Sequence, residues 1–190
     1  MSNIAIFASG SGSNAQNIIE YFQNSKNTHV KCILCNSLKA FVLERARNLN
    51  VNSFVFDRKG FYNENKVLDY LKSQEIDIVV LAGFLWLIPE NLIKAYPNKI
   101  INIHPALLPK YGGKGMYGMH VHQAVVDNNE QESGITIHYV NERYDEGDII
   151  FQAKCKVDST DTPDDVARKV HELEYKHFPR VIEQVILKSN

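Results

Sequence analysis

The chain has 190 residues, 44% of them hydrophobic, and its 21 Lys and Arg against 22 Asp and Glu give a formal net charge of −1. This length favours one domain, or at most two, with an ordinary hydrophobic core that needs no disulfide scaffold. Binding to nucleic acid or to an anionic membrane is largely electrostatic, so the near-neutral charge and the absence of a Lys/Arg block argue against both partners. A small-molecule ligand is expected instead.

The N-terminal segment predicts a cytoplasmic protein. Residues 1–7 contain no basic region and lead into a strand-like segment instead of the apolar core of a signal peptide. The longest apolar run, residues 78–88, contains Gly83 and is shorter than the roughly 20 residues that a membrane helix needs. We therefore expect no membrane partner.

Short apolar runs alternate with helical periodicities along the first half of the chain. The expected strands are Ile4–Ala8, Val30–Cys35, Phe54–Phe56, Asp77–Leu81 and Ile100–His104. The expected helices are 15–22, Ala40–Leu49, roughly Tyr62–Ser73 and one that follows Pro89. Alternating strands and helices predict an α/β fold, here a single-domain, Rossmann-like, mostly parallel sheet with helices on both faces.

The second half of the chain has a different texture. A glycine-rich segment, Gly112–Gly118, predicts a mobile loop, and two β-type runs follow at Gly134–Val140 and Asp148–Val157. The sequence Thr162-Pro163-Asp164-Asp165 then has a capping side chain, a proline in the first turn and acids near the positive end of a helix dipole. This predicts a long C-terminal helix, with Pro179 as the point where it could kink.

The turn after the first strand, Gly10-Ser11-Gly12-Ser13-Asn14-Ala15, formally fits the dinucleotide-binding pattern G-x-G-x-x-G/A. That pattern also needs an acid at the end of the second strand, where this chain has Cys35-Asn36-Ser37. The turn still offers backbone N–H groups at a helix start, with the Ser13 hydroxyl and the Asn14 amide, which is a suitable site for a terminal phosphate. A plain strand-to-helix turn is the alternative.

Asn102 and His104 lie two residues apart at the end of an apolar strand, so both side chains project from one face at the carboxyl edge of the sheet. An amide donor beside an imidazole can stabilise a developing oxyanion and move a proton, as acyl transfer requires. Asp145, in the turn Tyr144–Gly147, could orient His104 and favour its protonated form. The alternatives are residues that cap a loop and a solvated turn acid.

Metal chemistry is not expected. A metal site could be sought among His104, His120, His122 and His138. Of these, His120 and His122 are close in sequence, but no third ligand is fixed nearby with carboxylate or thiolate support. Cys32 and Cys35 are spaced C-x-x-C, but they belong to a strand, where an odd offset sends the side chains to opposite faces. They are interpreted, together with Cys155, as inert core cysteines.

The segment that follows Gly83 is richer in large apolar groups than a loop needs. It reads Phe84-Leu85-Trp86-Leu87-Ile88 and comes directly after a predicted strand. Core packing explains it most simply, and a slot for a flat heteroaromatic group is the alternative.

Taken together, these motifs resemble the formyltransferase family that uses 10-formyltetrahydrofolate, and the resemblance covers nearly the whole chain. The matching segments are Ser9–Asn14, Phe41 with 43–47, Val80–Phe84, Asn102–Pro105 with Leu107–Tyr111, and Asp145–Gly147. Their order and spacing are specific, although each segment alone is modest. The resemblance implies one formyltransferase domain over residues 1–190, and most closely the branch of the family that acts in de novo purine biosynthesis.

The resemblance also implies a role for individual residues. The catalytic residues would be Asn102, His104 and Asp145, the substrate phosphate and ribose would be held by Gly12, Ser13, Asn14 and Glu174, and the folate by Leu85, Trp86, Leu87, Ile88 and Asn102. The formyl group of 10-formyltetrahydrofolate, a co-substrate, would pass directly to the amine of N1-(5-phospho-D-ribosyl)glycinamide without a metal. Four features depart from the family pattern: Trp86 replaces a frequent Arg, His171 lies near a frequent Gln, Lys114–Met119 includes additional residues, and an Arg that some relatives have near Glu64 has no counterpart.

Other functions within and beyond this family stay open at this point. A formyltransferase acting on tRNA would be expected to have a further RNA-binding domain and a basic surface. A formyltetrahydrofolate hydrolase shares the residues implied to be catalytic but usually has an N-terminal regulatory domain, whereas the first strand here begins at Ile4. A nucleotide-binding module without catalysis would bind ligand without turnover.

Overall fold

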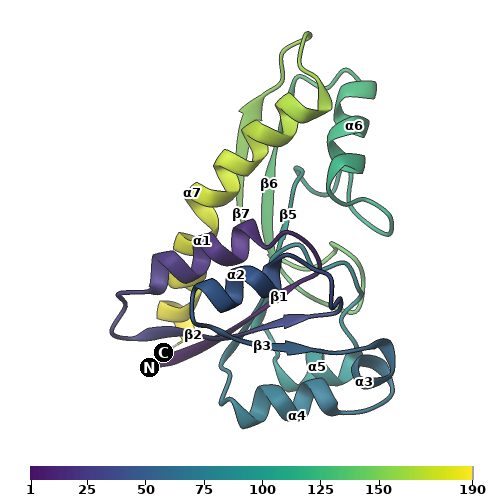
Figure 1. Cartoon of the computed structure of the whole chain (residues 1–190). Coiled ribbons are helices and arrows are strands. Elements are labelled where there is room, and N and C mark those ends of the chain that lie inside the picture. The colour runs from purple at the N-terminus through teal and green to yellow at the C-terminus, as the bar shows by residue number, and fades with distance from the viewer. Residues whose placement is uncertain (190) are drawn as a thin grey trace. The chain divides into compact units, whose positions relative to one another are not determined.

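The computed structural model of the protein describes residues 1–189 (Figure 1). The chain forms two compact units, Met1–Ile101 and Asn102–Ser189. Within residues 1–189, seven strands form a sheet in which hydrogen-bonded neighbours follow the order β3-β2-β1-β4-β5-β6-β7. The strands are β1 (Ser2–Ala8), β2 (Thr28–Cys35), β3 (Asn52–Val55), β4 (Ile78–Leu81), β5 (Ile100–His104), β6 (Glu132–Tyr139) and β7 (Ile149–Lys156).

The first unit has the alternating pattern that the sequence predicts. Strand β1 pairs in parallel with β2 and with β4, and β2 pairs in parallel with β3. In Figure 1, α1 and α2 lie on one side of these strands, and α4 lies on the other. The helices of this unit are α1 (Ser13–Phe22), α2 (Val42–Asn48), α3 (Arg58–Tyr62), α4 (Lys66–Ser73) and α5 (Glu90–Ala95).

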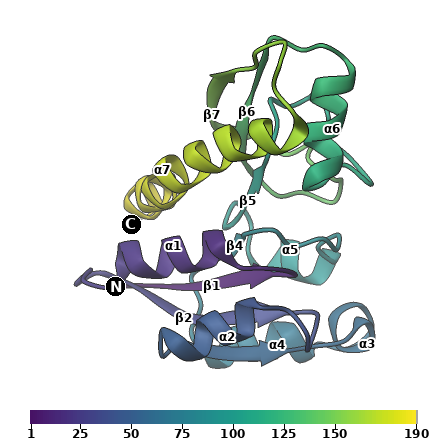
Figure 2. The same ribbon diagram turned by 45° about the horizontal axis from the view of Figure 1, so that its top comes forward.

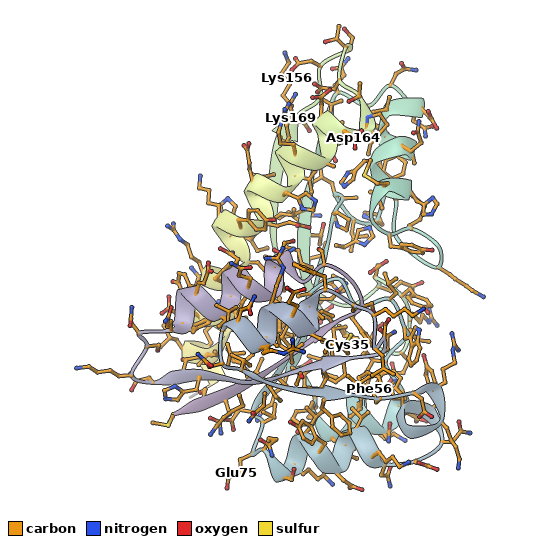
Figure 3. The ribbon with its side chains drawn as sticks, in the orientation of Figure 1. Cys35, Phe56, Glu75, Lys156, Asp164 and Lys169 are labelled. Atoms are coloured by element: carbon orange, nitrogen blue, oxygen red, sulfur yellow. The ribbon has the colours of Figure 1, made fainter. Side chains whose placement is uncertain are left out.

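Burial explains why β1, β4 and the second half of β2 have no polar face. Ile4, Ile6 and Phe7 of β1 are fully buried, as are Ile33 and Leu34 of β2. A parallel sheet covered on both faces requires such continuous apolar runs. The pairing of β2 with β3 continues one residue beyond β3. There the Phe56 N–H donates to the Cys35 carbonyl oxygen at 3.1 Å, and both residues are labelled in Figure 3.

One predicted helix in this unit is wrong in its extent. The segment expected as a single helix, roughly Tyr62–Ser73, is instead two helices, because α3 begins at Arg58 and ends at Tyr62 before α4 begins at Lys66. The Asp57 carboxylate caps α3 by accepting from the Gly60 N–H at 2.8 Å. A capped start at this position was a signal for a separate short helix.

The second unit contains the antiparallel pair β6 and β7 with helices α6 (Met119–Asp127) and α7 (Pro163–Ser189). Helix α7 lies beside β6 and β7 in both Figure 1 and Figure 2. The sequence predicts α7 correctly, and it continues through Pro179 as one helix of 27 residues. Helix α6 was not predicted, because its glycine-rich approach and its two histidines hid a buried stripe formed by Val121, His122 and Val125.

The start of α7 is fixed by reciprocal hydrogen bonds. The Thr162 N–H donates to the Asp165 carboxylate at 3.0 Å, and the Asp165 N–H donates to the Thr162 hydroxyl at 3.2 Å. Such a capping box satisfies donors that a helix start would otherwise leave unpaired. Lys169, near Lys156 in Figure 3, donates to the Lys156 carbonyl oxygen at 3.2 Å and so ties the first turns of α7 to the end of β7.

The predicted fold class is confirmed: an α/β fold with a mostly parallel sheet and a long C-terminal helix. The extent of the formyltransferase domain, residues 1–190, stays a prediction. No helix within residues 1–189 is both long and apolar enough to span a bilayer. Cys32 and Cys35 are buried, and burial raises the pKa of the Cys32 thiol to about 12, which supports the interpretation of inert core thiols. The prediction is wrong for Cys155, which lies in β7 and is only half-buried.

Candidate active site

The second unit brings together the three residues that the sequence singles out for chemistry. Asn102 and His104 are at the end of β5, and Asp145 is in the turn between β6 and β7. Asp145 has a φ of 56°, a left-handed conformation that aspartate tolerates better than most residues. Its carboxylate lies 3.5 Å from His104 Nδ1 and 3.4 Å from Asn102 Nδ2.

His138 of β6 is a fourth member of this cluster, which the sequence reasoning considered only as a metal ligand. Its Nδ1 lies 2.7 Å from the Tyr139 carbonyl oxygen, which can only accept, so Nδ1 carries the hydrogen. Its Nε2 lies 3.0 Å from the Asn102 amide nitrogen and 3.6 Å from the Asp145 carboxylate. The contact between His138 and Asn102 fixes the orientation of the Asn102 side chain, with its NH₂ group toward the cluster.

His104 is held on both ring nitrogens. Its Nε2 donates to the Tyr111 carbonyl oxygen at 2.7 Å, while Nδ1 faces Asp145. Only 4% of the residue is exposed, and burial lowers the pKa of His104; Asp145 and the Tyr111 carbonyl oppose this shift without cancelling it. The expectation that Asp145 favours the protonated form is therefore correct in direction, but burial is the stronger influence.

Asp145 is the charged centre of the cluster. Burial alone would raise the pKa of Asp145, but its contacts with His138, His104 and the Gly113 N–H outweigh burial and hold that pKa below its usual value. The Gly113 N–H donates to Oδ2 at 2.9 Å. An ionised carboxylate is thus available to compensate positive charge on His104.

The loop after β5 is anchored beside these groups by polar residues of β6 and by Glu130. The buried Thr136 hydroxyl donates to the Ala106 carbonyl oxygen at 2.7 Å and accepts from the Leu108 N–H at 3.0 Å. The Tyr111 hydroxyl donates to Glu130 at 2.9 Å. Together these bonds fix the carbonyl that accepts from His104.

Glu174 lies on α7 in the same unit and is 4% exposed. Its charge acts on the pKa of His104 and on that of His122, so the carboxylate lies within electrostatic range of the cluster. His171, one helical turn earlier, contacts Glu174 through Nδ1 at 2.8 Å. Neither His122 nor His171 was predicted as a site residue.

In the first unit, the predicted phosphate turn is built by the backbone. Gly12 is the N-cap of α1 with a φ of 74°, and no side chain caps the helix. A Cβ at Gly12 would lie 2.3 Å from Val42 Cγ2, so only glycine fits. The Val42 N–H donates to the Gly10 carbonyl oxygen at 3.1 Å, and Arg45 Nε donates to the Ser11 carbonyl oxygen at 2.9 Å. These bonds hold the turn in place at the start of α1, where a helix presents its first backbone N–H groups.

The segment Leu85–Ile88 is joined to this turn, because the Leu85 N–H donates to the Ser9 hydroxyl at 3.1 Å. Trp86 packs its ring against Phe56, Phe61 and Tyr62, with centroids about 6 Å apart. Core packing therefore accounts for much of this segment. Leu85 is 46% exposed, and the segment follows the carboxyl end of β4 in the chain.

No group of three or more His, Cys, Asp and Glu side chains within residues 1–189 is arranged to hold a metal ion. The polar cluster of the second unit is instead a hydrogen-bonded network of one amide, one carboxylate and two imidazoles. Such a network can stabilise an oxyanion and move a proton.

Comparison with known proteins decides the family. The family model described as "Formyl transferase" matches residues 2–182. The chain belongs to the formyl transferase family. Among curated family members, the chain is 35% identical over 195 residues to phosphoribosylglycinamide formyltransferase of Bacillus subtilis, a match covering 100% of the chain and 97% of that protein.

Other members of the formyl transferase family agree. The chloroplastic phosphoribosylglycinamide formyltransferase of Arabidopsis thaliana is 40% identical over 185 residues, which cover 94% of this chain and 63% of the plant protein. The crystal structure of phosphoribosylglycinamide formyltransferase from Bacillus halodurans superimposes with a TM-score of 0.89 at 32% identity, covering 100% of this chain and 97% of that chain. The similarity therefore spans both units of the chain.

Proposed function

We propose that this chain transfers the formyl group of 10-formyltetrahydrofolate to the amine of N1-(5-phospho-D-ribosyl)glycinamide, giving formylglycinamide ribonucleotide in purine biosynthesis. The observation that carries the proposal is the buried network of Asn102, His104 and Asp145 at the end of β5. The names of the full-length relatives support the same reaction.

The reaction requires one new C–N bond, one broken C–N bond and one moved proton. The free amine of the acceptor attacks the formyl carbon, whose carbonyl oxygen becomes an oxyanion. The bond to N10 of the folate then breaks as N10 gains the proton that the attacking nitrogen loses. Because both substrates are held together, much of the rate comes from their orientation.

His104 and Asn102 are proposed to stabilise the oxyanion. The His104 Nε2–H donates a hydrogen bond to the Tyr111 carbonyl oxygen in the free protein, so the oxyanion would replace that carbonyl as the acceptor. The Asn102 amide holds His138 at 3.0 Å and Asp145 at 3.4 Å, and the longer contact is the one that an oxyanion can displace. Asp145 would then compensate the charge of protonated His104.

The resemblance to the family assigns a binding role to individual residues of each unit. Gly12, Ser13 and Asn14 would bind the phosphate through the start of α1, and Glu174 would accept hydrogen bonds from the ribose hydroxyls. The backbone of Leu85, Trp86, Leu87 and Ile88, with the Asn102 amide, would bind the folate. The chemistry needs no metal, and we propose a cytoplasmic enzyme with small-molecule partners only.

The proposal is tested by following 10-formyltetrahydrofolate spectroscopically with and without glycinamide ribonucleotide. Consumption that requires the acceptor is the expected result. Equal consumption without acceptor, with formate released, would indicate a hydrolase. Binding of both ligands without turnover would indicate a non-catalytic nucleotide-binding module.

A further inference from the structure

The contacts of His171 on α7 form an arrangement that the proposed reaction does not yet use. Its Nδ1 lies 2.8 Å from Glu174 Oε2, three residues further along the helix. The Tyr175 ring stacks on the imidazole with an interplanar angle of 13°. From α6, the His122 ring approaches edge-on, with centroids 6.5 Å apart. The imidazole is thus restrained by neighbours of both helices.

The two histidines of this arrangement have opposite electrostatic environments. The hydrogen bond with Glu174 raises the pKa of His171, whose side chain is 48% exposed and can exchange protons with solvent. His122 is 2% exposed, and burial together with His171 lowers its pKa to about 4. Its Nδ1 is buried without a hydrogen-bond partner in the described chain. The protonated form is therefore favoured at His171 and disfavoured at His122.

We propose that His171 is a positioning residue for the acceptor substrate: it fixes the Glu174 carboxylate for the ribose hydroxyls, and its proton keeps the pair neutral toward the anionic acceptor. This inference rests on the proposed function, in which Glu174 holds the ribose. The titratable groups that face His171 are Glu174 and Tyr175 from α7 and His122 from α6.

Orientation is the first part of the argument. A carboxylate accepts hydrogen bonds from two neighbouring hydroxyls only in a limited range of side-chain rotamers. The charge-assisted bond at 2.8 Å, between residues three apart on one helix, restricts the Glu174 rotamer. Because Glu174 is almost fully buried, solvent screens this bond less than it screens an exposed ion pair.

Charge is the second part of the argument. With His171 protonated, the pair with Glu174 has no net charge. Loss of that proton leaves a net charge of −1 beside the binding groups, and the acceptor itself has a phosphate. Like charges repel each other more strongly in a partly buried site than at an exposed surface. Affinity for the acceptor should therefore fall as the pH rises through the pKa of His171.

The test compares His171→Ala and His171→Gln with the wild type, using glycinamide ribonucleotide and 10-formyltetrahydrofolate. Loss of a charge-assisted hydrogen bond should raise the KM for glycinamide ribonucleotide about tenfold in His171→Ala, while kcat and the KM for the folate change less than about twofold. His171→Gln keeps an N–H donor without the charge, so at pH 7 it should recover the part of the affinity that comes from the orientation of Glu174 but not the part that comes from the charge.

The pH profile distinguishes positioning from a merely structural role. Between pH 6.5 and 8.5 the wild-type KM for glycinamide ribonucleotide should rise more than that of His171→Gln, whose profile contains only the titrations of substrate and other groups. The matched control is His177→Gln, a histidine of the same helix that packs on Phe151, and it should keep the wild-type profile. Identical pH profiles for wild type and His171→Gln would overturn the inference. A tenfold loss of kcat in His171→Ala without a change in the KM for glycinamide ribonucleotide would overturn it as well.

Calorimetric titration with glycinamide ribonucleotide alone separates this inference from the proposed function. If the wild type binds this ligand with the expected pH dependence but never forms product, the proposed reaction fails and the positioning role stands. If turnover occurs and binding is insensitive to His171, the positioning role fails and the reaction stands. If the ligand does not bind, both fail.

Discussion

The cluster around His104 and the turn Ser9–Asn14 are two polar regions built in opposite ways. The cluster consists of side chains, and backbone carbonyl groups determine which ring nitrogen of each histidine carries a hydrogen, as the Tyr111 carbonyl does for His104. The turn consists of backbone whose shape is fixed by Gly12 and by contacts with α2. A side-chain cluster can move protons and responds to pH, whereas a backbone turn offers a permanent anion site that does not titrate.

The largest effect should come from His104→Ala. Because a positioned proton donor contributes roughly 10²–10⁴ in rate, turnover should fall by about that factor while the protein stays folded. His120→Ala is the matched control, since His120 is exposed at the start of α6. Steady-state kinetics with circular dichroism makes the comparison, and near-wild-type turnover in folded His104→Ala would remove this residue from the mechanism.

Gly12→Ala should damage the turn by a steric route instead. The left-handed backbone at Gly12 disfavours any side chain, and an added Cβ would overlap the Val42 side chain. We expect a loss of roughly 2–4 kcal/mol in the free energy of unfolding, measured with urea. Gly10→Ala is the control, because a Cβ at Gly10 meets nothing within 4 Å. Equal stability of the two variants would show that the turn is not rigid.

The acid sensitivity of folding should come from the second unit. Burial lowers the pKa of His122 to about 4 from a usual value of 6.5. A depressed folded-state pKa gives stability that is present above pH 6.5 and is lost as the pH falls toward 4. Between pH 7 and 5 this residue should account for about 2 kcal/mol of the lost free energy of unfolding.

His122→Gln removes that titration and leaves the other acid-sensitive groups in place. The variant should therefore lose about 2 kcal/mol less than the wild type over the same interval, measured by urea unfolding at pH 7 and pH 5. The same pH dependence in both proteins would mean that His122 is already solvated in the folded state.

Ser13→Asp should have the smallest of these effects and should act on one substrate. A carboxylate among N–H groups meant for phosphate repels the dianion and competes for its donors. We expect at least about a tenfold weaker affinity for glycinamide ribonucleotide and little change for the folate. Ser13→Ala is the control that removes only the hydroxyl. Equal losses for both ligands would point to a general disturbance of the turn.

The sequence predicts the two regions unequally. The turn is visible because glycine, serine and a helix start are adjacent, and Asn102 with His104 is visible because strand periodicity places them on one face. His138 was harder to find, since its role depends on pairing with Asn102 from a strand remote in sequence. The available signal was the alternation of Thr136 and His138 with apolar residues along β6, and the structure shows that both are buried.

The errors in the predicted helices have separate causes. Helix α6 follows glycines that indicate a loop, and its apolar stripe includes a histidine, so the periodicity was weak. Helices α3 and α4 were merged because the break between them contains polar residues that a helix tolerates. Burial of its apolar stripe stabilises α6, whereas the start of α3 depends on the local cap from Asp57.

Transfer of an isotope label tests the central claim most directly. The wild type is incubated with donor labelled with ¹³C at the formyl carbon, glycinamide ribonucleotide and excess unlabelled formate, and the products are followed by NMR. Direct transfer at the Asn102–His104–Asp145 cluster predicts that each labelled formyl group lost from the folate appears in formylglycinamide ribonucleotide, undiluted by formate. Label released as free formate, or product diluted by the unlabelled pool, would contradict direct transfer.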